Sequence, residues 1–379
     1  MPALSAGVAL LNAAMGAASA VSTIAAVHRL GIGWAAVPNT AGVVGTGIGA
    51  LALSHLMSRH GPRAGLVLGY FAATVGAGLG AYAVTRTDAI GLTLGMLLLG
   101  LGNAAAQLSR YTAADLYPAT RRGFAIGAVV WAATLGAVGG PLLLAPSSRF
   151  AMWVGGVSLA GPYLFAMLAC AVAAIAASAA PTHAARTDRP GAPMRDLLRT
   201  PAARSAFAVM VTGHVIMVAV MTAAPLDMHR HGHGMAAVGT VLSAHTLGMF
   251  ALSPLTGRLL DRYGAHPVMV AGLVTLAVAA GVTAASGTQP VPRVAGLFLL
   301  GYAWNLCFIG GSGRLARDLP AVDRARVEGA VDAGVWSVAA LASLLSTVAL
   351  EIGGYGLLAG SAAALVIPPL LLLHRLHRT

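Results

Sequence analysis

Charged residues are scarce in this 379-residue chain: Asp, Glu, Lys and Arg make up 9% of it, and lysine does not occur at all. Soluble domains carry about a quarter of their residues as charges, because charged side chains cover the surface that faces water. A soluble globular fold is therefore excluded. Cysteine is nearly absent too. Because Cys170 and Cys307 fall in different halves of the chain, we expect no disulfide between them.

Apolar residues are in excess: they make up 58% of the sequence, and the mean hydropathy is +0.80. They form repeated runs of about 20 residues, the length that an α-helix needs to cross a bilayer. We therefore predict an all-α membrane protein with twelve transmembrane helices. The expected spans are residues 5–27, 35–57, 64–84, 91–113, 124–145, 157–179, 203–224, 236–257, 266–286, 293–315, 328–349 and 353–373.

The net charge of +12 comes from arginine alone, and the arginines are distributed unevenly between the expected loops. If both termini lie in the cytoplasm, 18 arginines fall on the cytoplasmic side and 5 on the other. Cytoplasmic loops of membrane proteins carry such an excess of basic residues. The basic charge therefore predicts the orientation of the spans, with both termini in the cytoplasm, and does not indicate a nucleic-acid partner.

The two halves of the chain repeat the same short motifs at offsets of 201, 202 and 203 residues. The matching pairs are Leu98–Gly100 with Leu299–Gly301, Gly127–Val129 with Gly329–Val331, and Gly61 with Gly264. A nearly constant offset indicates a duplicated unit of six helices, which is typical of secondary transporters. We predict an N-terminal six-helix bundle at 1–179, a cytoplasmic linker at 180–202 and a C-terminal six-helix bundle at 203–379.

The loop after span 236–257 runs from Gly257 to Gly264 and reads GRLLDRYG. It resembles the signature loop of the major facilitator superfamily, G-x-x-x-D-R-x-G. A second motif, with Gly127, Gly136, Gly140 and Pro141 in span 124–145, is similar to the antiporter-associated motif of that superfamily. The resemblance implies the two-bundle fold of the superfamily over the whole chain. From the residues themselves, Gly257 and Gly264 are expected to form a tight turn with positive φ.

Charged residues near the predicted cytoplasmic ends of the spans are expected to form a gate. Asp261 in the signature loop can face the N-terminus of a neighbouring helix, where a negative charge is favourable. Arg110 and Asp115 lie toward the inner end of span 91–113. We predict that they form one gate network with Asp261 and Arg262.

Sulfur and imidazole side chains are concentrated in the seventh and eighth expected spans. At 100° per residue, Met210, His214, Met217 and Met221 form one narrow stripe on the first of these helices. His245 and Met249 lie one turn apart on the second. Thioether and imidazole ligands suit a soft ion, Cu(I) before others. The predicted metal ligands are Met217, Met221, His245 and Met249, with Met210, His214, His231 and His233 as accessory ligands.

The pairs Met217-x3-Met221 and His245-x3-Met249 resemble the paired motifs of CcoA-like copper importers, a branch of the major facilitator superfamily. The resemblance implies copper uptake across a bacterial inner membrane, with copper as transported substrate and not as cofactor. His231 and His233 in the outer loop are expected to collect the ion. We expect no enzymatic activity, no cofactor, and a monomer whose partners are the lipid bilayer and the substrate.

Proton-coupled transport of an organic solute, a drug or riboflavin, is the alternative function. Some relatives of the copper-importer branch are thought to move riboflavin. Trp304 and Trp336, in the tenth and eleventh expected spans, could stack on a planar ligand. Glu328 and Asp332 begin the eleventh span, and either could carry a coupling proton.

Overall fold

A computed structural model describes residues 1–30, 37–180, 192–231, 235–287 and 289–378 of the chain, which form fifteen α helices and one short 3-10 helix. The helices of the first half are α1 (Pro2–Leu30), α2 (Val37–His60), α3 (Pro62–Arg86), α4 (Ala89–Asp115), η2 (Ala119–Arg121), α5 (Arg122–Leu142), α6 (Leu144–Trp153) and α7 (Ala160–Ser178). Those of the second half are α8 (Met194–Leu198), α9 (Pro201–Arg230), α10 (Met235–Phe250), α11 (Ser253–Tyr263), α12 (Ala265–Ala285), α13 (Pro290–Asp318), α14 (Ala321–Ala364) and α15 (Ile367–Arg378).

Ten helical stretches among the described residues are long and apolar enough to cross a membrane, and each coincides with an expected span. The other two expected spans are helical as well. Span 236–257 is divided between α10 and α11, and span 328–349 lies inside α14. The prediction of an all-α membrane protein is therefore confirmed, with ten of the twelve expected spans meeting this criterion among the described residues.

Two backbone interruptions have a clear chemical cause. Between α10 and α11, the helix breaks at the residues just before Pro254, whose ring clashes with the carbonyl of Phe250 and which has no amide hydrogen to donate. Inside α14, Gly354 has a φ of 67°, a conformation that glycine adopts without strain. This corner separates the expected spans 328–349 and 353–373.

Among the described residues, the connections between the spans contain two short α helices besides η2. Residues 146–156, between two expected spans, are largely covered by α6. Of the predicted linker 180–202, residues 181–191 lie outside the described part of the chain, and residues 194–198 form α8.

The chain divides into two compact units. Unit 1 comprises Met1–Leu116, Ala132–Ala192 and Pro320–Ala333, and unit 2 comprises Tyr117–Trp131, Pro193–Leu319 and Gly334–Thr379. The first residues of α5 thus belong to unit 2, and the first residues of α14 belong to unit 1. The predicted domain boundaries at residues 179 and 203 stay a prediction.

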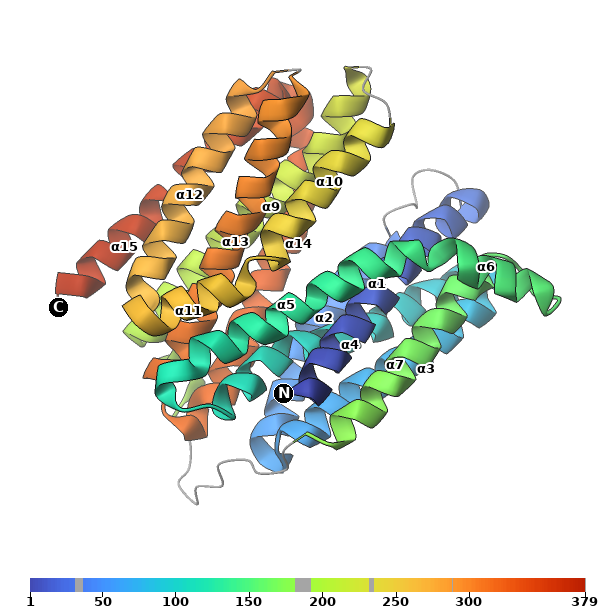
Figure 1. Cartoon of the computed structure of the whole chain (residues 1–379), viewed down its shortest axis with the longest axis horizontal. Helices are drawn as coiled ribbons and strands as arrows, with labels where there is room; N and C mark the ends of the chain where they lie inside the picture. Colours follow the sequence, from blue (N-terminus) through green and yellow to red (C-terminus); the bar gives the residue numbers. More distant parts are fainter. Residues whose placement is uncertain (31–36, 181–191, 232–234, 288, 379) are drawn as a thin grey trace. The chain divides into compact units, whose positions relative to one another are not determined.

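In unit 1, α4 packs closely against α2 and α3, and α7 packs against α1 and α3 (Figure 1). In unit 2, α13 packs against α12, α10 and α9. Glycines of the repeated motif permit the close approach in both units. A Cβ at Gly100 would collide with the carbonyl of Gly42 in α2, and a Cβ at Gly301 would collide with the carbonyl of His245 in α10.

The turns that follow α2 and α11 have the same backbone conformation. Gly61 has a φ of 86° and Gly264 a φ of 83°, so the second of the two expected turn glycines does adopt positive φ. The expectation for Gly257 is wrong: it lies within α11, where a Cβ would collide with the carbonyl of Gly123. Gly257 therefore serves close packing and not a turn.

Candidate functional site

Five ring side chains from four helices of unit 2 meet around His214 of α9. Trp304 and Trp336 present their rings edge-on to His214, at centroid distances of 5.2 and 5.5 Å. Phe308 lies 5.8 Å from His214 and stacks on Trp304 at 4.6 Å. Phe250 of α10 completes the group at 5.8 Å from Trp304. We call these five residues the His214 aromatic cluster.

Hydrogen bonds fix the His214 ring within the cluster. Its Nδ1 lies 3.2 Å from the carbonyl oxygen of Met210, and Trp304 Nε1 lies 3.1 and 3.2 Å from its two ring nitrogens. Since a carbonyl only accepts, Nδ1–H donates to Met210 and the Trp304 N–H is left to donate to Nε2. Both nitrogens of His214 are thus engaged within the protein. Trp336 and Phe250 are only half-buried, so part of the cluster is accessible to a ligand.

One ring nitrogen of His245 in α10 is hydrogen-bonded, and the other has no hydrogen-bond partner among the described residues. Its Nδ1 donates to the carbonyl oxygen of Leu297 in α13 at 3.0 Å. Its Nε2 is buried and has no hydrogen-bond partner among the described residues. The same helix is held to α13 by Asn305, whose Nδ2 donates to the carbonyl oxygen of Met249 at 2.6 Å. A buried imidazole nitrogen with a lone pair can accept a hydrogen bond from a ligand or bind a metal ion.

The predicted sulfur ligands differ in their surroundings. Met210 is fully buried, and a Cβ at Gly311 would lie 2.7 Å from its sulfur, so this thioether serves packing between α9 and α13. Met217, Met221 and Met249 are half-buried. The helices α9 and α10 pack mainly against α13 rather than against each other. The described residues contain no group of three or more His, Cys, Asp or Glu side chains that could hold a metal.

A buried ion pair lies at the far end of α9, beside the loop that is predicted to collect the metal ion. Arg293 donates to Asp227 at 2.7 Å and to the carbonyl oxygen of Gly287 at 2.8 Å. His231 is exposed, with its Nδ1 2.8 Å from the carbonyl oxygen of Asp227. His233 lies outside the described residues.

Two ion pairs join α4 to the start of α14 in unit 1, one of them fully buried. Arg110 donates to both carboxylate oxygens of Asp332, at 2.7 and 2.9 Å, and to the hydroxyl of Tyr111 at 2.9 Å. Asp115 pairs with Arg324. Arg110 and Asp115 thus each have a partner in α14, within the same unit.

Glu328 lies beside these two pairs. It is 3% exposed, and its Oε1 has no hydrogen-bond partner among the described residues. The charged groups around it are Asp115, Arg324, Arg110 and Asp332. Both arginines are already paired with an aspartate, so Glu328 is a buried carboxyl next to two arginines that already have acidic partners.

Asp261 belongs to α11, and its carboxylate lies against the N-terminus of α5, within unit 2. Its two oxygens accept the amides of Gly123 and Phe124 at 2.8 and 2.7 Å, and Arg317 pairs with it at 2.7 Å. Arg262, expected in the same network, is exposed and has no carboxylate partner among the described residues. Within each unit, Asp261, Arg110 and Asp115 pair with other residues. A network that joins them with Arg262, and a gate role for it, stays a prediction.

The residues that pair with the gate candidates, Arg317, Arg324 and Asp332, were not predicted as ion-pair partners. A further repeat in the sequence points to Arg317 and Arg324. Asp115-Leu-Tyr-Pro118 in the first half matches Asp318-Leu-Pro320 in the second. The arginines that pair with Asp261 and Asp115 flank this second copy.

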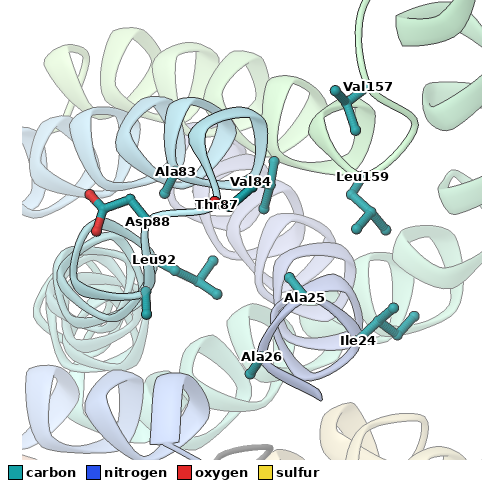
Figure 2. A pocket seen from close by; sticks show the side chains of 11 residues that line it. Ile24, Ala25, Ala26, Ala83, Val84, Thr87, Asp88, Leu92, Val157 and Leu159 are labelled. Carbon is teal, nitrogen blue, oxygen red and sulfur yellow. The ribbon is translucent and has the colours of Figure 1, made fainter. Parts of the chain in front are cut away.

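A separate cavity of about 540 Å³ lies in unit 1, at the ends of α1, α3 and α4 (Figure 2). Its wall is mostly aliphatic, with Ala25, Leu92 and Leu159 among the lining residues. The carboxylate of Asp88, its one charged group, accepts the amide of Ile90 at 3.0 Å and so caps α4. This cavity has few polar groups to orient a solute.

The protein is an all-helical membrane protein with an internal repeat. Buried ion pairs and clusters of side chains lie between its helices. This is the architecture of a multi-pass carrier. Comparison with known proteins identifies the family. The model of the Major Facilitator Superfamily matches residues 205–378. The "Uncharacterized MFS-type transporter YdeG" of Bacillus subtilis (strain 168) is 31% identical over 380 residues, covering 94% of this chain and 87% of the relative. The chain belongs to the major facilitator superfamily of secondary transporters.

Two further likenesses are informative. "Riboflavin transporter RfnT" of Brucella anthropi is 30% identical over 346 residues, covering 87% of this chain and 84% of the relative. The crystal structure of a bacterial homologue of the iron transporter ferroportin has a TM-score of 0.77 at 14% identity, covering 100% of this chain and 99% of that one. At this identity the structural likeness shows the fold alone.

Proposed function

We propose that the protein carries a planar aromatic organic solute, with riboflavin as the reference ligand, and that the His214 aromatic cluster binds its ring system. The observation that carries this proposal is an aromatic group drawn from three helices: Trp304 and Trp336 meet at His214, and Phe250 packs edge-on against Trp304. Offset-stacked and edge-to-face ring pairs each contribute about 0.5–1.5 kcal/mol beyond area burial. The similarity to a riboflavin transporter supports the same class of solute.

His245 supplies a polar contact of the kind that orients a ligand. Because its Nδ1–H is directed to Leu297, its Nε2 accepts a hydrogen bond. The ring system of riboflavin carries an N–H donor at its edge. A ligand N–H at Nε2 would satisfy a buried acceptor that has no partner among the described residues, and leaving such a group unsatisfied costs about 1–3 kcal/mol.

Glu328 is the proposed carrier of a coupling proton. A buried carboxyl beside two arginines that are each paired with another acid can take up or release a proton without breaking an ion pair of its own. We place the carrier in a bacterial inner membrane with both termini in the cytoplasm, the orientation that the arginine distribution predicts. The proton gradient would then drive solute movement, parallel to proton flow in a symporter and opposite to it in an antiporter.

Riboflavin binding by purified protein tests the proposal, since protein binding quenches riboflavin fluorescence. Trp336→Leu removes a half-buried ring of the cluster and is expected to weaken binding about tenfold, whereas Trp336→Phe keeps a ring and most of the affinity. Trp153, 82% exposed on α6, provides the matched control: Trp153→Leu leaves binding unchanged. Equal affinities in all four proteins would overturn the proposal.

Copper is the second candidate, and His245 is the observation that favours it. A metal-binding histidine commonly donates its other ring N–H to a carbonyl oxygen, as His245 does. Met217, Met221 and Met249 offer soft ligands that suit Cu(I). The candidates are distinguished by titrating the protein with Cu(I) and with riboflavin. Copper binding predicts that His245→Gln and Met221→Leu lose the ion while Trp336→Leu retains it.

A further inference from the structure

A second cavity, of about 590 Å³, lies in unit 2 where η2 and the start of α5 face α11. Its lining differs from that of the apolar cavity in unit 1. Three arginines line it, Arg121, Arg258 and Arg262, together with the hydroxyl-bearing side chains of Tyr117 and Thr120. Phe124 and Asp261 complete the wall. We call this cavity the Arg258 pocket.

The carboxylate of Asp261 does not neutralise these arginines. Its oxygens accept the amides of Gly123 and Phe124 and pair with Arg317, which does not line the pocket. Within the described part of the chain, none of the three pocket arginines has a carboxylate within 4.0 Å. The pocket therefore brings together three positive charges, none of which forms an ion pair with a described residue.

Aromatic rings hold two of the guanidinium groups in place. The guanidinium of Arg258 lies 5.7 Å from the ring centroid of Phe124, and that of Arg262 lies 5.2 Å from that of Tyr263. Cation–π contacts of this length orient a guanidinium without neutralising its charge. Its N–H groups stay available for an anion from outside the protein.

We propose that the Arg258 pocket binds the phosphate group of an anionic phospholipid. Guanidinium groups bind phosphate oxygens through paired, charge-assisted hydrogen bonds, and hydroxyls such as those of Thr120 and Tyr117 can donate to the same oxygens. The volume of the pocket exceeds that of a bare phosphate ion and accommodates a headgroup with its glycerol.

The predicted orientation supports a lipid as the source of the phosphate. With both termini in the cytoplasm, the pocket lies at the cytoplasmic leaflet, whose anionic lipids attract basic clusters. A bound phosphate would join η2, α5 and α11 within unit 2, which stabilises the turn region that Asp261 already ties together. This inference does not depend on the transported solute.

The test compares purified protein in vesicles of phosphatidylcholine alone with vesicles that also contain phosphatidylglycerol. Native mass spectrometry reports bound lipid, and thermal unfolding reports its effect on stability. We expect phosphatidylglycerol to bind and to raise the unfolding temperature. In the triple variant Arg121→Gln, Arg258→Gln, Arg262→Gln, binding should fall by about tenfold or more, and the gain in unfolding temperature should disappear.

A second triple variant serves as the matched control. Arg195, Arg199 and Arg375 are exposed, fall on the same predicted side of the membrane and do not line the pocket, so their change to Gln removes the same charge. Equal lipid binding by both triple variants would overturn the proposal. Arg258→Lys keeps the charge but not the paired geometry and is expected to bind lipid more weakly than the native protein.

Inorganic phosphate distinguishes the two sources of the same chemistry. If millimolar phosphate displaces phosphatidylglycerol and stabilises the protein equally in phosphatidylcholine vesicles, the pocket is a site for free phosphate and the lipid assignment fails. If phosphate has no effect while the lipid does, the assignment holds. Unfolding in phosphatidylcholine alone checks that each variant is folded.

Discussion

Arg110 and Asp332 lie 222 residues apart in the chain, yet the guanidinium of one donates to both oxygens of the other at 2.7 and 2.9 Å. Both side chains are almost completely buried, with 1% and 3% exposure. Two charges removed from water in this way are stable only as a pair. The pair ties α4 to the start of α14 inside unit 1.

Removing one member of this pair should destabilise the protein strongly. Asp332→Ala leaves the Arg110 guanidinium buried with one acidic partner fewer, and we expect a loss of about 3–5 kcal/mol in the free energy of unfolding. The double change Arg110→Met, Asp332→Leu removes both charges and should recover most of the stability. Thermal unfolding in detergent measures both. A single variant as stable as the native protein would show that the pair contributes little.

Asp261 should contribute less, because its side chain is 14% exposed and its partner Arg317 is 19% exposed. Asp261→Ala removes an ion pair and two hydrogen bonds to the N-terminus of α5, and we expect a loss of about 1–2 kcal/mol. The neighbouring change Arg262→Ala is the control, measured in phosphatidylcholine alone, because that side chain has no carboxylate partner among the described residues. Equal losses in the two variants would contradict the assignment.

Glycine at the α10–α13 contact tests the close packing of helices. A Cβ at Gly301 would collide with the backbone carbonyl of His245, which cannot rotate away. Gly301→Ala should therefore cost about 3 kcal/mol of stability. Gly281 in α12 has open space where its Cβ would lie, so Gly281→Ala should be neutral or stabilising by up to about 1 kcal/mol. Unfolding temperatures of the two alanine variants decide the matter.

Glu328→Gln tests the coupling proposal. The amide keeps the size of the side chain but cannot carry a proton, so we expect riboflavin binding to persist while riboflavin-driven proton movement in sealed vesicles falls to background. Asp318, half-exposed in a pair with Arg314, provides the control: Asp318→Asn should leave proton movement unchanged. Full proton movement in the Glu328 variant would remove this residue from the coupling path.

The sequence is a good guide to features that depend on local patterning. The apolar runs predict the spans, and the positive φ of Gly264 follows from its place in the loop. Helical periodicity places Met210 and His214 on one face, and the His214 ring bonds to the main-chain carbonyl of Met210 one turn earlier. Gly257 shows the limit of this reasoning, because a glycine needed for packing and one needed for a turn look alike in a sequence.

Features that depend on tertiary packing could not be predicted. Nothing near Arg110 in the chain indicates that Asp332 would be its partner, because hydrophobic patterning fixes helices but not their neighbours. The sequence points to Trp304 and Trp336 as possible ligand contacts, yet their meeting at His214 requires α9, α13 and α14 to be brought together. Whether Met217 and Met221 serve a metal likewise depends on what the other helices contribute.

The 29 residues of α13 connect three of these features along one rod. Arg293 anchors its first turn to Asp227, Trp304 contacts His214 near its middle, and Arg317 grips Asp261 in its last turn. A rigid helix transmits a small rotation along its whole length. A solute bound at Trp304 would therefore act on the same helix that carries both ion pairs, and any rotation of α13 would displace Arg293 and Arg317 together.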